Sequence, residues 1–182
     1  MRKALLFLGI LNDADIEWLI ATGAKQHLNP GEVLIQEGRP ATSVFLVLEG
    51  LLSVVTEAAG NQEIATLRSG EIVGEMSFVD SRPPSATVRA AEPSSLLVIP
   101  KSSLEQRLSQ DAPFAARFYR AIAVFLSDRL RSTVGLLGYG SAQITGEQAN
   151  GADEIDPAVL DNVSLAGSRF DFLQRRLRAL GS

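Results

Sequence analysis

The chain contains no cysteine and only one histidine, His27, among its 182 residues. It therefore forms no disulfide and no thiolate metal site, and metal sites built from several histidines are excluded. The lone histidine also argues against Ser-His-Asp catalysis. A chain without cysteine is typical of a reducing compartment, so we expect a cytoplasmic protein.

Positive charge and long apolar runs are also scarce. The chain has 17 Lys and Arg against 21 Asp and Glu, a net charge of -4, which argues against nucleic-acid binding through general phosphate attraction. No apolar run approaches the ~20 residues of a transmembrane helix. The apolar run at residues 4–11 has no small-residue cleavage site after it, so we interpret it as a packing segment rather than a signal peptide.

Residues 29–100 have the pattern of a β domain. Short runs rich in Val, Ile and Leu alternate with turns that contain Gly, Pro or Asn, which is typical of a barrel or a double-sheet jelly roll. The predicted strands are 33–36, 44–48, 51–57, 63–67, 72–73, 86–90 and 96–100.

Helices are predicted on both sides of this β region. Asn12 or Asp13 suits the N-cap of a helix that ends near Ile20, and residues 102–109 predict a second helix. Asp111 suits the cap of a long helix from about residue 113 to 134. Its apolar positions recur at helical spacing: Phe114, Phe118, Ile122, Phe125, Leu126, Leu130 and Val134. This stripe is long enough to pair with a second copy, so we predict a homodimer; a purely intramolecular core helix is the alternative.

The last part of the chain differs in composition. Residues 141–167 hold five acidic residues and no Lys or Arg, so residues 136–167 are predicted as a flexible acidic linker. Residues 168–182 predict a short basic amphipathic helix with Phe170, Leu173 and Leu177 on one face. Residues 168–180 either dock on a protein partner or a membrane surface, or fold back on the chain or its dimer mate.

The most informative stretch begins at Gly74. A Gly-Glu pair starts a short helical turn, Pro83 and Pro84 end it, and a strand-like run follows. Such a turn directs free backbone N–H groups into one small space, which is how proteins hold a phosphate. The carboxylate of Glu75 is suited to accept hydrogen bonds from sugar hydroxyls.

Residues 1–135 resemble the cyclic nucleotide-binding domain family. Residues 30–38 resemble its first hairpin, residues 45–50 its next strand and turn, and residues 67–75 lead into its phosphate-binding cassette. The resemblance implies a mainly β domain with flanking helices: a jelly-roll β-roll, N-terminal helices and a long C-terminal helix. It implies a regulatory domain that binds cAMP or cGMP and relays binding by moving that helix. The implied ligand-binding residues are Gly74, Glu75, Met76, Ser77, Arg82, Ser85, Ala86 and Thr87, with no metal and no other cofactor.

The chain departs from the family pattern at one position. The family's Arg that pairs with the cyclic phosphate falls on Pro84, and Arg82 is the nearest cation. Two hypotheses therefore stay open: a cyclic nucleotide sensor, or a degenerate member that acts as a dimeric interaction or scaffolding module or binds another anionic ligand. Bacterial relatives such as the catabolite activator protein carry a helix-turn-helix after the long helix; here one short helix follows, so we expect no direct DNA binding. No nucleophile–base pair indicates an enzyme.

Overall fold

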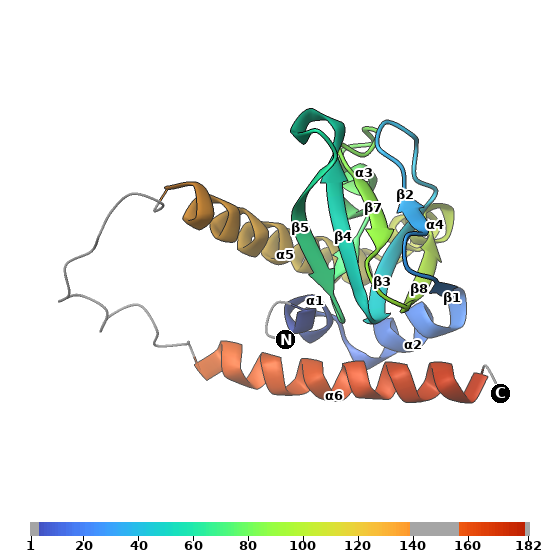
Figure 1. Cartoon of the computed structure of the whole chain (residues 1–182). Coiled ribbons are helices and arrows are strands. Elements are labelled where there is room, and N and C mark those ends of the chain that lie inside the picture. The colour runs from blue at the N-terminus through green and yellow to red at the C-terminus, as the bar shows by residue number, and fades with distance from the viewer. Residues whose placement is uncertain (1–3, 139–156, 181–182) are drawn as a thin grey trace.

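The structure, a computed structural model, describes residues 4–138 and 157–180. Two four-stranded antiparallel sheets face each other, with helices at both ends of the chain (Figure 1). One sheet has the order β1 (Ala24–Leu28), β8 (Ser94–Pro100), β3 (Ser43–Glu49), β6 (Ile72–Val73). The other has the order β2 (Val33–Ile35), β7 (Thr87–Ala90), β4 (Leu51–Thr56), β5 (Gln62–Arg68). The predicted jelly-roll class with flanking helices is confirmed.

The helices are α1 (Ala4–Ile10), α2 (Asp13–Thr22), α3 (Glu75–Val79), α4 (Lys101–Gln110), α5 (Ala112–Gly138) and α6 (Pro157–Leu180), and a 3₁₀ turn, η1, covers Glu57–Ala59. In the described ranges no helix combines the length and the apolar character needed to cross a bilayer.

Alternation along β3 explains why the fold has two cores. Successive side chains of a strand point to opposite faces, and both faces of β3 are covered. Val44, Leu46 and Leu48 belong to the core shared with the helices. Phe45 and Val47 belong to the core between the two sheets. Because both faces of β3 are buried, the strand needs apolar residues at nearly every position.

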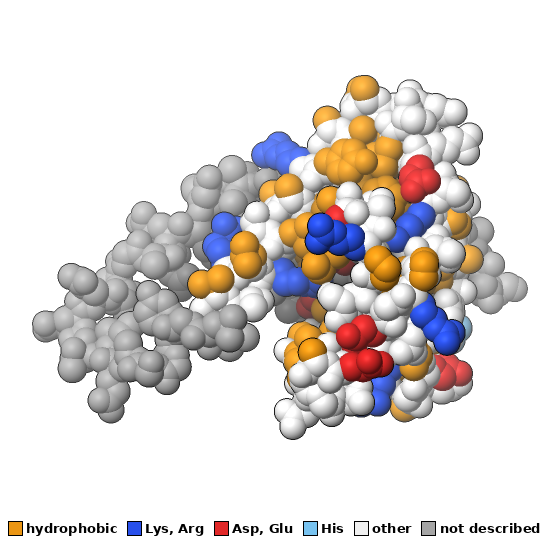
Figure 2. All heavy atoms as spheres, turned by 90° about the horizontal axis from the view of Figure 1, so that it is seen from above, with side chains coloured by type: hydrophobic (Ala, Val, Ile, Leu, Met, Phe, Trp, Pro, Cys, Tyr) orange, Lys and Arg blue, Asp and Glu red, His pale blue; other side chains and the backbone are white. Residues whose placement is uncertain are grey.

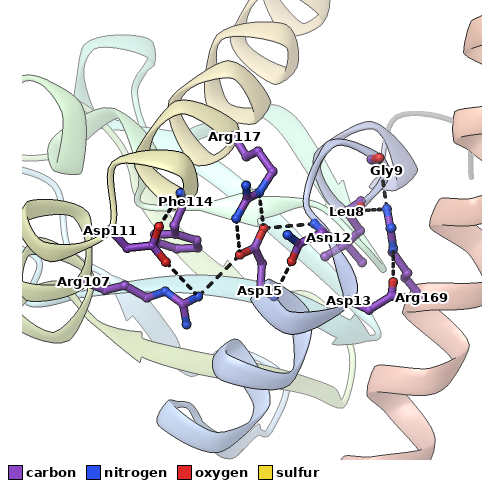
Figure 3. Close-up of polar contacts among 10 residues, drawn as sticks. All are labelled: Leu8, Gly9, Asn12, Asp13, Asp15, Arg107, Asp111, Phe114, Arg117 and Arg169. Carbon is purple, nitrogen blue, oxygen red and sulfur yellow. Dashed lines mark hydrogen bonds and ion pairs between the residues drawn. The ribbon is translucent and has the colours of Figure 1, made fainter.

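Asp15 joins α2 to the helices that follow the sheets (Figure 3). Its carboxylate is fully buried and accepts hydrogen bonds from Arg117 Nε at 2.7 Å and Nη2 at 2.9 Å, and from Arg107 Nη2 at 3.5 Å. It also closes a capping box with Asn12, whose side chain accepts from Asp15 N–H at 2.9 Å. Burial raises the pKa of Asp15, but these hydrogen bonds outweigh it and leave the pKa below its usual range. The first half of α5 is thereby fixed to the N-terminal helices.

Apart from shifts of one or two residues at the ends of elements, the structure differs from the predictions in one strand and two helices. Strand β1 was not predicted, because of its five residues only Leu28 is buried and a polar edge strand gives little apolar signal. Helix α5 continues to Gly138, past the predicted end near Val134. Helix α6 begins at Pro157, so residues 157–167, assigned to the linker, are helical. The rest of the predicted linker between 139 and 156 lies outside the described residues.

Helix α6 folds back onto its own chain, which was one of the two alternatives for this segment. Figure 1 shows it lying across the end of the domain that carries α1 and α2. Leu173 and Leu177 are buried in the same core as α1 and α2, and Phe170 packs against that core. The intervening basic side chains stay at the surface, as the amphipathic pattern predicts.

Candidate functional site

A left-handed glycine starts the cassette between β6 and β7. Gly74 has φ 83° and precedes the single turn of α3. A Cβ at this position would lie 3.0 Å from the Ser43 carbonyl oxygen, so both the backbone angle and the space favour glycine. The first helical hydrogen bond of α3 runs from Phe78 N–H to the Gly74 carbonyl at 3.2 Å. The N–H groups before Phe78 thus have no intrahelical acceptor, as expected for a first helical turn.

The cassette borders a cavity of about 280 Å³. Figure 2 views the molecule from above and shows hydrophobic side chains beside Lys and Arg side chains at the centre of this face. Apolar walls come from both sheets: Ile35, Val54, Leu67, Val73 and Val88. Seven of the predicted ligand-binding residues line the cavity: Gly74, Glu75, Met76, Ser77, Arg82, Ser85 and Ala86.

Thr87, the eighth predicted residue, does not line this cavity. Its hydroxyl oxygen accepts hydrogen bonds from Glu37 N–H at 3.0 Å and from Gln36 Nε2 at 3.3 Å. The hydroxyl therefore ties β7 to the turn after β2. Sequence spacing placed Thr87 in the cassette, but its strand position directs the hydroxyl to these partners instead.

Glu75 lies inside the cavity with only 2% of its surface exposed. Its Oε1 is 2.6 Å from Nη1 of Arg129, a residue of α5. Burial raises the pKa of Glu75 above its usual range; the Arg129 charge opposes this shift and Glu71 adds to it. The carboxylate predicted to bind a sugar is thus held by a cation from the long helix.

Arg129 is a cavity residue that the sequence reasoning did not identify. Its guanidinium lies 4.7 Å from the centre of the Phe125 ring, and its Nη2 is 3.9 Å from Glu71 Oε2. This Nη2 atom is buried and, within the described parts of the chain, has no hydrogen-bond acceptor. Its position offered a signal, since Arg129 follows Phe125 by four residues on the apolar stripe of α5.

The cation nearest to the phosphate position in the sequence does not turn inward. The Arg82 side chain is 84% exposed and lies 4.0 Å from the Asp80 carboxylate. Pro84, at the position of the family's Arg, lines the cavity and offers neither charge nor N–H. No group of three or more residues suited to hold a metal occurs in residues 4–138 and 157–180.

The chain is similar in sequence to a family of ligand-binding domains and to several curated proteins. Residues 25–111 match the family model described as "Cyclic nucleotide-binding domain". The chain is 28% identical over 112 residues to potassium channel KAT1 of Oryza sativa subsp. japonica, covering 61% of this chain and 16% of the channel. It is 31% identical over 130 residues to the CRP-like protein Clp of Xanthomonas campestris pv. campestris, covering 68% of this chain and 55% of that protein.

Among solved structures, a cyclic nucleotide-binding domain from Methylobacillus flagellatus superposes with a TM-score of 0.67 at 22% identity. The match covers 75% of this chain and 82% of that one, and at this identity it shows the fold alone. The chain spans a sixth or less of the first curated relatives, so their channel and enzyme activities say nothing about the function of this chain.

Proposed function

Since residues 25–111 belong to the cyclic nucleotide-binding domain family, we propose that the chain binds cAMP or cGMP in the cassette cavity and relays binding through α5. One observation carries the proposal. The buried carboxylate of Glu75 is paired at 2.6 Å with Arg129 of α5, so a ligand that engages this carboxylate acts directly on the helix.

The cavity offers a partner for each part of a cyclic nucleotide. The Glu75 carboxylate accepts from ribose hydroxyls, and the apolar walls pack against the base. The first-turn N–H groups of α3 and the Ser85 hydroxyl donate to the cyclic phosphate. Arg129 Nη2, buried beside the cavity without a hydrogen-bond acceptor, supplies the positive charge that Pro84 lacks.

Binding then changes the position of the second half of α5. The Arg117–Asp15 contacts fix the first half, whereas Leu130 and Val134 beyond Arg129 are 64% and 55% exposed. Ligand hydroxyls that compete for Glu75 weaken its pair with Arg129 and release this half. The exposed leucine and valine would pack against a second copy, so the proposal includes a homodimer. It also includes a cytoplasmic, non-enzymatic regulatory role.

The second candidate is a degenerate member of the family that acts as an interaction or scaffolding module or binds another small anion. Two observations favour it: Pro84 takes the place of the phosphate Arg, and the Arg82 side chain is largely exposed beside Asp80. In this case a protein partner would use residues 168–180, and Arg129 would serve only to neutralise Glu75.

Calorimetric titration with cAMP and cGMP separates the two candidates. We expect binding that Glu75→Gln weakens about 10- to 150-fold, the value of one charged hydrogen bond. Glu105→Gln, on the exposed face of α4, is the matched control. Because burial raises the pKa of Glu75 and binding uses its ionised form, affinity should fall as the pH drops through that raised pKa. No heat and no thermal stabilisation at millimolar nucleotide would favour the interaction module.

A further inference from the structure

Helix α6 lies outside the residues that match the family, yet it is held by specific contacts. Arg169 donates to the Asp13 carboxylate at 2.8 Å and to the carbonyls of Leu8 and Gly9 at 3.3 and 3.1 Å. These two carbonyls end α1, where a helix carries unsatisfied acceptors and partial negative charge. Arg169 therefore caps α1 from another part of the chain (Figure 3).

Two further contacts hold the C-terminal part of α6. Gln174 Nε2 donates to the Leu48 carbonyl at 2.7 Å, and Arg178 Nη2 lies 2.6 Å from Glu49 Oε1. Between these polar contacts Leu173 is fully buried. The surface under α6 thus has an apolar centre flanked by two carboxylates, those of Asp13 and Glu49, and it matches a basic amphipathic helix.

A continuous series of aromatic contacts connects this groove to the cassette. Phe78 of α3 packs edge-on against Phe118 of α5, with ring centroids 5.8 Å apart. Phe118 in turn packs edge-on against Phe7 of α1 at 5.7 Å. Helix α1 then packs directly on α6. A shift of α3 or α5 cannot leave Phe118 in place without opening a gap in a close-packed core.

We propose that α6 is a latch whose docking is coupled to the cassette: occupation of the cavity shifts Phe78 with α3 and turns the Phe118 ring away from Phe7, while the Arg117–Asp15 contacts hold the backbone of this half of α5; α1 is thereby loosened and α6 is released. The released helix presents Leu173 and Leu177 to a protein partner that offers an apolar groove flanked by carboxylates, the chemistry of its own docking surface. The ligand-dependent step rests on the proposed function. The latch itself does not, because a change within the chain at Phe78 should release α6 as well.

The absence of cysteine provides a direct measurement. Leu173→Cys places one thiol in the fully buried interface, and its rate of modification by a thiol reagent reports how often α6 opens. Leu177→Cys is the second reporter if the first fails to fold. Arg176→Cys, on the exposed face of α6, should react at the rate of a free thiol throughout.

The latch contacts are tested first, without ligand. Arg169→Gln removes three hydrogen bonds and should accelerate modification of Leu173→Cys by about tenfold or more. Arg175→Gln is the matched control, since Arg175 is exposed and, among the residues that the structure describes, donates within α6 to the Asp171 carbonyl. Equal rates in the two variants would overturn the latch.

Coupling is tested with cAMP and with Phe78→Leu. If calorimetry shows cAMP binding, saturating cAMP should accelerate modification about fivefold or more, and an unchanged or slower rate overturns the coupling while the proposed function stands. If only cGMP binds, it replaces cAMP in this experiment. If neither nucleotide binds, the proposed function fails, and the Phe78→Leu variant alone tests the coupling. Faster modification in that variant supports the coupled latch, and an unchanged rate overturns it.

Discussion

Replacing Arg129 with alanine tests the geometry of the site most directly. The substitution removes the cation that lies 2.6 Å from Glu75, together with the buried Nη2 that has no hydrogen-bond acceptor in residues 4–138 and 157–180. It therefore acts on the ligand-free protein, where Glu75 loses its partner, and on the complex, where the phosphate loses a donor. The first effect changes the unfolding free energy of the free protein. The second changes the affinity for a ligand, and only for a ligand that carries a phosphate.

The expected magnitudes follow from burial. Removal of one partner from a fully buried ion pair costs about 3–5 kcal/mol. The Arg129 side chain is 33% exposed, so solvent screens the pair and we expect a loss of about 1–2 kcal/mol in unfolding free energy. For a ligand phosphate, loss of one charged hydrogen bond costs about 1.5–3 kcal/mol, or about 10- to 150-fold in affinity.

Calorimetry with two ligands isolates the phosphate effect. Arg129→Ala should weaken cAMP by this factor, whereas adenosine, which keeps the ribose hydroxyls and lacks the phosphate, should bind with unchanged or higher affinity. Arg131→Ala, an exposed arginine on the same helix, should change neither affinity. Equal weakening of cAMP and adenosine would refute the assignment of Arg129 to the phosphate.

Two other predictions follow from the same contacts. Pro84→Arg restores the family's cation at the cavity wall and should raise cAMP affinity about 10- to 150-fold in the same titration; no gain would mean that the loop does not direct this position to the phosphate. Asp15→Ala should cost about 3 kcal/mol and lower the melting temperature by about 6–12 °C, read from Trp18 fluorescence, because Arg117 loses its buried carboxylate partner and Arg107 keeps only the more exposed Asp111. The folded-state pKa of Asp15 lies below that of the unfolded chain, so this contribution is present above about pH 4 and is lost as the pH falls through the folded-state value. A wild-type–variant difference that stays constant down to pH 2 would contradict this assignment.

Most of the β domain could be predicted because local pattern specifies it. The seven predicted strands all occur, with boundaries shifted by at most two residues, since apolar runs bounded by Gly and Pro turns have few alternatives. The polar edge strand β1 gave no such signal. Its pairing with β8 depends on backbone hydrogen bonds to residues about 70 positions away, which no local pattern encodes.

In the cassette, too, some features follow from the local sequence and others depend on contacts between distant residues. Glycine at residue 74 and the start of a short helix at Glu75 could be predicted from local order, because a left-handed backbone angle favours glycine. Where Thr87 directs its hydroxyl depends on strand pairing: it lies against Glu37 and Gln36, which the order of residues in the cassette does not indicate.

The sequence by itself determined that a β-roll with a cassette exists, that a long helix follows, and that the phosphate position holds a proline. Tertiary structure alone decided that Arg129, 54 positions from Glu75, pairs with this carboxylate in the cavity, and that α6 lies against α1 instead of extending away. The physical reason is the range of the interactions. Turns and strand periodicity act between neighbours in the chain, whereas ion pairs and core contacts join residues that only folding brings together.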